Sequence, residues 1–247
     1  MARKIISRTY VLNLHNILYS KQFGFRNNHS TALALIDLIN NISSAIDRNE
    51  TTLGIFLDLS KAFDTINHER LRQKLQHYGI WDTALAWIKS YLEDRTQFVQ
   101  FGSHRSYLRK ILCGVPQGSI LGPLLFIIYI NDLPKVSSLT QSLLFADETS
   151  IFCSHKDANQ LVSIFNNELA KIIIWLKVNK LSLNLTKTNF LIFHPRQKKV
   201  SVNAPPTLEN TVIKQVTETK FLGVLIDQHL SWKPHIDFVS KKISKSV

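Results

Sequence analysis

The chain has 247 residues, 45% of them hydrophobic, which is enough to bury the core of one large domain or of one domain plus a fragment. Its 30 lysine and arginine residues outnumber its 18 aspartate and glutamate residues, so the formal charge is +12 and the pI is near 9.7. That charge favours a polyanionic partner such as nucleic acid, and it would also suit an anionic membrane surface.

The same survey excludes several classes of protein. The longest apolar run, residues 120–130, has 11 residues and falls well short of the roughly 20 that a membrane span needs. The first residues lack the apolar core of a signal peptide. The two cysteines, Cys113 and Cys153, match neither a zinc spacing nor a disulfide framework. We therefore expect an intracellular chain, in the cytoplasm or nucleus, that does not bind membranes and that buries both cysteines as apolar residues.

The first predicted elements are a helix and a buried strand. Apolar residues recur every three or four positions over residues 30–48, which predicts one helix with Ser30 or Thr31 as its N-cap. Residues 51–58 (TTLGIFLD) form a short apolar run that ends in an acid. Such a run is typical of a buried strand that carries a carboxylate to its C-terminal end.

Helices and a hairpin are predicted for the middle of the chain. Asn67 and its neighbours offer N-caps for a helix that Gly79 closes, and a second helix follows it. Residues 97–101 and 107–112 predict a hairpin, and residues 119–132 predict a buried helix.

The last part of the chain is predicted to hold a hairpin, a long helix and two strands. Two apolar arms within residues 143–153 flank the tetrapeptide ADET, which predicts a hairpin. Apolar residues at helical spacing predict an amphipathic helix over residues 159–179. Strands at residues 190–193 and 221–226 are separated by a polar loop. The order of elements predicts an α+β fold, with an antiparallel sheet and helices on one face.

Two acids of the predicted sheet are candidates for metal binding. Asp58 ends one strand and Asp147 lies in the turn of a hairpin, so their carboxylates converge if the two strands are neighbours. Converging carboxylates repel each other unless a cation lies between them, and oxygen ligands select Mg²⁺. A helix N-cap at Asp58 and ordinary turn residues at Asp147 and Glu148 fit the spacing equally well, so spacing alone leaves the choice open.

A set of ordered phrases resembles the palm motifs of reverse transcriptases from non-LTR retrotransposons of the LINE and jockey-like kind. Residues 56–64 (FLDLSKAFD) are similar to the first palm motif and residues 145–149 (FADET) to the hairpin motif. The other matching segments are residues 22–26 (QFGFR) with 29–31 (HST), residues 114–123 (GVPQGSILGP) with 129–133 (YINDL), residues 184–188 (NLTKT) and residues 221–227 (FLGVLID). These matches cover most of residues 22–237.

The resemblance implies a right-hand polymerase palm over residues 51–195. Residues 1–50 would form partial fingers and the connection from fingers to palm. Residues 196–247 would hold the primer-grip hairpin and the start of a truncated thumb, so that little or no thumb is present. The partners implied are an RNA template, a DNA primer and deoxynucleoside triphosphates.

The resemblance also implies roles for individual residues. Two Mg²⁺ ions, which Mn²⁺ could replace, would be held by Asp58, Asp147 and Glu148, and Glu148 stands where the family has a second aspartate. Asp58 and Asp147 would be catalytic together with Lys187, which matches the lysine that protonates or neutralises the departing pyrophosphate. An exposed structural lysine is the alternative for Lys187.

Six further residues are assigned to nucleotide, template and primer. Phe63 would lie beneath the incoming sugar and exclude a 2′-hydroxyl, and its alternative is a core aromatic. Residues assigned to the nucleotide and template site are Gln117 and Gly118, and those assigned to the primer grip are Phe221, Leu222 and Gly223.

The sequence departs from the family in ways that keep a second function open. The extra methylene of Glu148 displaces a carboxylate by roughly an ångström, an error that can cost about a hundredfold in rate. The segment before Gln22 is also too short for the basic fingers motifs, and residues 5–18 resemble only the helix that follows them. The chain is therefore interpreted either as an RNA-directed DNA polymerase or as a catalytically impaired, nucleic-acid-binding remnant of such an element.

A third class of enzyme shares the palm and its carboxylates. The FADE hairpin phrase, bulky Phe63 and the Pro-Gln-Gly run argue against an RNA-directed RNA polymerase. The uninterrupted spacing of the motifs argues against a telomerase-like enzyme.

Overall fold

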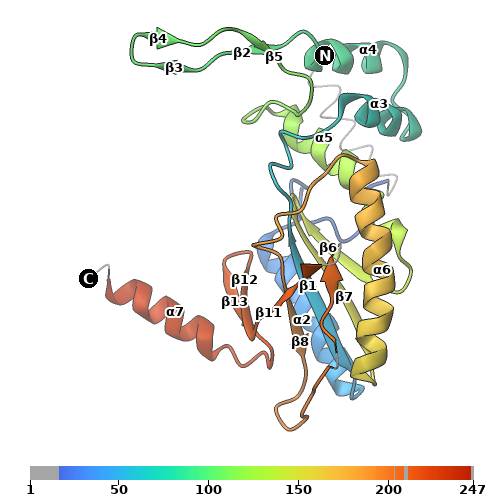
Figure 1. Ribbon diagram of the computed structural model, residues 1–247, viewed down its shortest axis with the longest axis vertical. Coiled ribbons are helices and arrows are strands. Elements are labelled where there is room, and N and C mark those ends of the chain that lie inside the picture. Colours follow the sequence, from blue (N-terminus) through green and yellow to red (C-terminus); the bar gives the residue numbers. More distant parts are fainter. Residues whose placement is uncertain (1–16, 203, 209–210, 246–247) are drawn as a thin grey trace. The chain divides into compact units, whose positions relative to one another are not determined.

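The computed structural model describes residues 17–202, 204–208 and 211–245 (Figure 1). Residues 1–16, the first part of the segment 1–50 assigned to the partial fingers and their connection to the palm, lie outside the described residues, and so does most of the helix expected at residues 5–18. By its internal contacts the chain divides into two compact units. The smaller unit comprises residues 1–20, 61–132 and 176–182, and the larger unit comprises residues 21–60, 133–175 and 183–247. No helix among the described residues is both long and apolar enough to cross a membrane.

The larger unit is built on a five-stranded sheet in the order β11-β8-β1-β7-β6. Its strands are β1 (Thr51–Asp58), β6 (Gln141–Phe145), β7 (Glu148–His155), β8 (Asn189–Phe193) and β11 (Lys214–Gln215). All neighbouring strands are antiparallel except β11 and β8. The prediction of an α+β fold with an antiparallel sheet is confirmed.

The apolar composition of β1 follows from its central position in the sheet. It lies between β7 and β8 and seven of its eight residues are buried, so both of its faces are apolar. Gly54 leaves space for the ring of Phe152 on the neighbouring strand, since a Cβ at residue 54 would lie 2.6 Å from that ring. Helix α2 (Thr31–Asp47) packs its buried face with Phe56 and Phe152 in one core. Ser30 caps α2 as predicted, because its side chain accepts the N–H of Leu33.

The remaining elements of the larger unit are short strands, a 3₁₀ helix and two helices. They are η1 (Leu133–Val136), α6 (Ala158–Val178), β9 (Thr207–Leu208), β10 (Thr211–Val212), β12 (Glu218–Phe221), β13 (Val224–Asp227) and α7 (Lys233–Ser244). The single strand predicted over residues 221–226 is wrong: a turn at Leu222 and Gly223 divides it into the hairpin β12–β13. Both turn residues have positive φ, 48° and 86°, which matches the twist of a tight hairpin.

The smaller unit holds three helices and a two-stranded ribbon. They are α3 (His68–His77), α4 (Asp82–Leu92), α5 (Leu121–Ile130), and the ribbon strands β2 (Thr96–Gln97), β3 (Gln100–Phe101), β4 (His104–Arg105) and β5 (Arg109–Lys110). Nine of the ten residues of α5 are buried, as predicted for this apolar run. Tyr129 of α5 donates its hydroxyl to the carbonyl oxygen of Asn179 at 2.5 Å, and burial raises the pKa of Tyr129 to about 12.

The prediction that both cysteines are buried is half right. Cys153 is buried in β7, where loss of hydration raises the pKa of its thiol. Cys113 is exposed, because it lies in the loop between β5 and α5, where its thiol contacts the carbonyl oxygen of Asp64 at 3.3 Å. No amphipathic pattern surrounds Cys113 in the sequence, so its exposure could not be predicted.

Candidate active site

The predicted acids gather at one end of the large sheet. β6 and β7 are joined by a two-residue turn, Ala146 and Asp147, and Glu148 is the first residue of β7. In the register of β1 with β7, Asp58 lies directly across from Glu148. Side chains of directly opposed residues on antiparallel strands are neighbours, with Cβ atoms about 5 Å apart. Asp58 and Glu148 are therefore neighbours, and Asp147 lies in the turn that precedes Glu148.

The pKa of Glu148 is raised by burial and, in part, by the charges of Asp147 and Asp58. Loss of hydration is the largest cause that raises the pKa of Glu148, and the carboxylates of Asp147 and Asp58 raise it further. The backbone N–H of Leu222 and the ammonium group of Lys220 lower the pKa of Glu148. A cation among these carboxylates would relieve their mutual repulsion.

The donor set suits a hard divalent cation that keeps water or substrate among its ligands. Among residues 17–202, 204–208 and 211–245, no three His, Cys, Asp or Glu side chains lie close enough to hold a metal ion by themselves. Mg²⁺ at phosphate-transfer sites is bound through one or two carboxylates plus phosphate oxygens and water. Asp58 and Asp147, both partly exposed, fit that pattern.

Lys187 lies beside one of these acids. Its Nζ is 3.9 Å from Oδ2 of Asp58, and both side chains are well exposed. Asn184 anchors the loop, because its N–H donates to the carbonyl oxygen of Asp58 at 2.8 Å and its own carbonyl accepts from Lys187 at 3.1 Å. An ion pair this long and exposed contributes little stability. The loop therefore presents a cation at the acidic end of β1.

Gln22 supports the turn that carries Asp147, a role that sequence did not predict. Its side chain is buried, and its Oε1 accepts from the N–H of Gly24 at 2.8 Å and from the N–H of Ala146 at 3.2 Å. Ala146 has a φ of 56°, which is unfavourable for a residue with a Cβ. The bond from Gln22 thus holds a strained residue next to Asp147.

The segment around Gln22 forms an additional edge beside β6. Phe23 donates its N–H to the carbonyl oxygen of Leu144 at 2.7 Å, and Leu144 donates to the carbonyl oxygen of Lys21 at 3.0 Å. Gly24 lies so close to the turn that a Cβ there would be 2.3 Å from the backbone nitrogen of Ala146. The QFG triplet was the available signal, but its partner lies 124 positions further along the chain.

The residues assigned to the primer grip lie in the same unit as the acids. Phe221 is buried, and its ring centroid is 5.5 Å from that of Phe56 in β1. This contact attaches the β12–β13 hairpin to the sheet. Leu222 and Gly223 form the turn of this hairpin, and the backbone N–H of Leu222 lowers the pKa of Glu148 at the start of β7.

The residues assigned to nucleotide and template form their own group in the smaller unit. The half-buried ring of Phe63 stacks on Phe126 with centroids 4.6 Å apart, which also fits the core-aromatic alternative. Gln117 donates from Nε2 to Asp64 at 2.8 Å. Gly118 has a φ of 75° and open space where a Cβ would lie, so its backbone conformation alone favours glycine.

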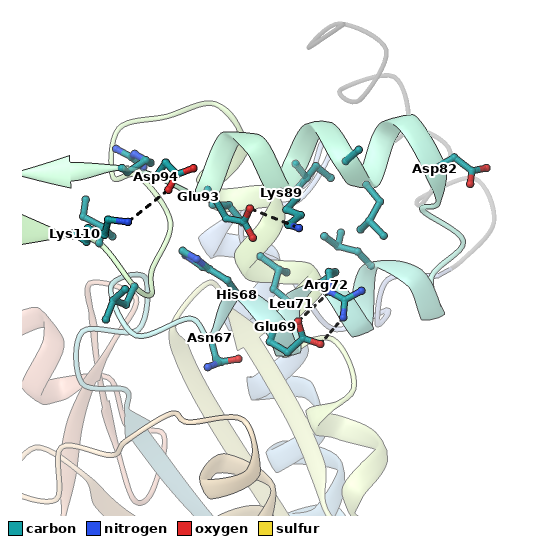
Figure 2. A pocket seen from close by; sticks show the side chains of 18 residues that line it. Asn67, His68, Glu69, Leu71, Arg72, Asp82, Lys89, Glu93, Asp94 and Lys110 are labelled. Carbon is teal, nitrogen blue, oxygen red and sulfur yellow. Dashed lines mark hydrogen bonds and ion pairs between the residues drawn. The ribbon is translucent and has the colours of Figure 1, made fainter.

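A large open cavity of about 880 Å³ lies elsewhere, among α3, α4 and the base of the ribbon (Figure 2). None of the predicted site residues lines it. Three ion pairs lie at its rim, Arg72 with Glu69, Lys89 with Glu93 and Lys110 with Asp94, as Figure 2 shows. The cavity is therefore not the candidate active site.

The fold places the chain among right-hand polymerases. It resembles the structure of apo telomerase from Candida tropicalis, truncated from its C-terminal domain, with a TM-score of 0.59 and 16% identity over 93% of this chain and 44% of that one. A telomerase from Candida albicans, solved with a fragment of telomeric RNA, matches with a TM-score of 0.52 and 16% identity over 79% of this chain and 33% of that one. At such identities the likeness concerns the fold alone.

Residues 1–226 match the model of the family described as reverse transcriptase (RNA-dependent DNA polymerase), and the chain belongs to this family. It is 32% identical over 246 residues to the "Probable RNA-directed DNA polymerase from transposon BS" of Drosophila melanogaster, covering 94% of this chain and 26% of the relative. The "Probable RNA-directed DNA polymerase from transposon X-element" of Drosophila melanogaster is 30% identical, covering 100% of this chain and 27% of the relative. The "RNA-directed DNA polymerase from mobile element jockey" of the same species is 28% identical, covering 92% of this chain and 25% of the relative. The chain spans about a quarter of the length of these relatives. The predicted resemblance to non-LTR retrotransposon reverse transcriptases is confirmed.

Proposed function

We propose that the chain is the catalytic part of a retrotransposon polymerase that copies RNA into DNA by adding deoxynucleotides to a primer 3′-hydroxyl. The observation that carries the proposal is the placement of Asp58 opposite Glu148, next to the turn that holds Asp147, in a reverse transcriptase domain. The RNA template, the DNA primer and the deoxynucleoside triphosphates are the proposed partners. Each of them is polyanionic, which suits the charge of +12.

Reverse transcriptases use divalent metals, and the finer assignment to two Mg²⁺ ions is part of this proposal. Asp58 and Asp147 would hold the ions, with Glu148 as the third carboxylate. When bound, such ions activate an attacking hydroxyl and stabilise the charge on the leaving phosphate. Lys187 would then neutralise or protonate the departing pyrophosphate, and its place 3.9 Å from Asp58 supports that role.

The other residues would position the substrates. Phe63 would lie beneath the sugar of the incoming nucleotide, and Gln117 and Gly118 would line the site for nucleotide and template. Primer-grip residues Phe221, Leu222 and Gly223 would hold the primer end, and the anchoring of Phe221 on Phe56 supports this function. We retain the palm at residues 51–195 and its flanking segments at 1–50 and 196–247 as the proposed functional division.

A second candidate is a nucleic-acid-binding remnant with impaired catalysis. The observation that favours it is Glu148 in place of the family's second aspartate, because the longer side chain displaces the carboxylate by roughly an ångström. This candidate keeps the basic surface and loses the chemistry.

The test is Mg²⁺-dependent primer extension on an RNA template with the parent chain, Asp147→Asn and Glu148→Asp. Asp157→Asn is a matched control, because Asp157 caps the start of α6 through its side chain and asparagine caps equally well. We expect extension by the parent and the control, and its loss in Asp147→Asn. Silence of the parent that Glu148→Asp relieves would assign the defect to one carboxylate. Silence of all four proteins, with intact RNA binding, would favour the remnant.

A further inference from the structure

The two-stranded ribbon of the smaller unit, residues 95–112, is continuous from its base to its tip. The pairs β2–β5 and β3–β4 are joined by the bond from the N–H of Ser106 to the carbonyl oxygen of Val99 at 2.9 Å. Ile111 donates to Arg95 at 2.8 Å and closes the base, and β3 and β4 form the far end (Figure 1). Gln97 pairs with Arg109 but Gln100 pairs with Arg105, so the returning strand contains one extra residue, a β-bulge. We call this element the basic ribbon.

Large apolar side chains of the basic ribbon are exposed to solvent. Phe101 is 87% exposed and Tyr107 is 89% exposed, and the further exposed members are Phe98, Val99, Leu108 and Leu112. A two-stranded ribbon has no core of its own and is only marginally stable in water. So much apolar surface on one thin element is typical of a surface that binds a partner.

The charge of the basic ribbon indicates the chemistry of that partner. It carries four cationic side chains and no acid between residues 95 and 120, and the cations are Arg95, Arg105, Arg109 and Lys110. The guanidinium group of Arg105 lies over the ring of Phe98, 3.4 Å from its centroid. Cross-strand register puts Arg105 and Phe98 on one face, since Arg105 pairs with Gln100, two positions after Phe98. Phe101, the neighbour of Gln100, lies on the other face together with Arg109, whose partner Gln97 is four positions before Phe101. Each face of the basic ribbon therefore combines a cation with an aromatic ring.

We infer that the basic ribbon binds an unpaired nucleic-acid strand, with bases stacked on Phe101 and Tyr107 and phosphates paired with Arg105 and Arg109. Grooves that bind single strands combine exposed aromatic rings with cationic side chains, because every base has a face that can stack. Lys110 is paired with Asp94 at 3.9 Å, but a purely apolar protein partner would leave the three arginines of the ribbon without counter-charge. The choice of nucleic acid over an anionic lipid surface rests on the proposed function, to which this contact adds a second site on the nucleic acid.

The test measures binding without catalysis, by fluorescence anisotropy of a short labelled single-stranded RNA over a range of salt concentrations, without Mg²⁺ or nucleotides. The stacking variant is Phe101→Ala with Tyr107→Ala, and the charge variant is Arg105→Ala with Arg109→Ala. The control replaces two exposed lysines outside the ribbon, Lys156→Ala with Lys199→Ala. Thermal melts establish that all variants are folded.

We expect the stacking variant to bind at least about tenfold more weakly than the parent. The charge variant should lower the slope of log affinity against log salt by about 1.4, since each phosphate contact with a single strand contributes about 0.7. Failure of primer extension would leave these binding results intact, so the two proposals are distinguishable. Unchanged RNA binding in both ribbon variants would overturn the inference. The inference would also be overturned if the ribbon variants bound RNA like the parent but differed from it in binding to phosphatidylserine vesicles. A change in oligomeric state with unchanged RNA binding would overturn it equally.

Discussion

Replacing Gln22 with methionine tests whether the turn that carries Asp147 depends on a single buried amide. Methionine has nearly the shape of glutamine but offers no comparable acceptor, so the N–H groups of Gly24 and Ala146 lose their partner. A buried donor left without a partner costs about 1–3 kcal/mol. Part of this cost is offset, because Nε2 of Gln22 is itself buried without a partner among the described residues, and the substitution removes it.

The net loss of stability on Gln22→Met is therefore about 1–3 kcal/mol, and the loss of activity should be larger than stability alone explains. Ala146 is held at a φ of 56°, a conformation that costs about 1–2 kcal/mol, so its release lets the turn relax. A displacement of Asp147 by roughly an ångström would lower the rate of extension by about a hundredfold. Gln22→Glu keeps the shape and an oxygen acceptor, and should retain more activity.

The assay compares the maximal rate of primer extension, its dependence on Mg²⁺ concentration and the affinity for primer–template in the folded variants. A positioning role predicts a lower maximal rate and a weaker response to Mg²⁺, with unchanged affinity for primer–template. If Gln22→Met lowers only the melting temperature and extends primers like the parent, then Gln22 merely stabilises the fold and the reasoning is wrong.

Two further predictions concern the same end of the sheet. Gly24→Ala should lower the free energy of unfolding by about 1–3 kcal/mol, because the new Cβ would lie 2.3 Å from the backbone nitrogen of Ala146. The control is Gly79→Ala, at a positive φ in open space, which should lower the free energy of unfolding by only about 1 kcal/mol in the same melts. Glu148→Gln should raise the melting temperature at neutral pH without divalent ions. Because the folded pKa of Glu148 is raised, its ionisation opposes folding above that pKa, so the gain should disappear below pH 4.5, the ordinary pKa of the group, and a gain that persists there would contradict this cause.

The sequence was sufficient to predict those elements whose structure follows from their own local pattern of apolar residues. The run TTLGIFLD predicted β1 to the residue, because a strand buried on both faces is apolar throughout. The sequence also predicted that the end of β1 and the turn of the later hairpin lie close together if their strands are neighbours, and β1 pairs with β7 so that Asp58 lies across from Glu148. Helix α2 followed from the periodicity of its buried face.

The sequence was insufficient where a contact joins distant segments. Gln22 owes its role to a backbone N–H at Ala146, and no local pattern distinguishes a buried amide with such a partner from an exposed one. The strand predicted over residues 221–226 had the apolar composition of a strand, but Leu222 adopts a positive φ that its residue type does not favour. In both places tertiary contacts outweigh local preference.

Glu148 connects the two hairpins that the proposed mechanism needs to act together. Glu148 lies across from Asp58, and the backbone N–H of Leu222, in the turn of the β12–β13 hairpin, lowers the pKa of its carboxyl. An aspartate at residue 148 would withdraw the carboxylate by the length of one methylene, away from Leu222. We therefore expect the glutamate to favour contact with the proposed primer grip over proximity to the proposed metal ligands. It follows that Glu148→Asp should weaken the hold on the primer end even where it restores the geometry of the acids, and that the affinity for primer–template and the rate of extension should change in opposite directions.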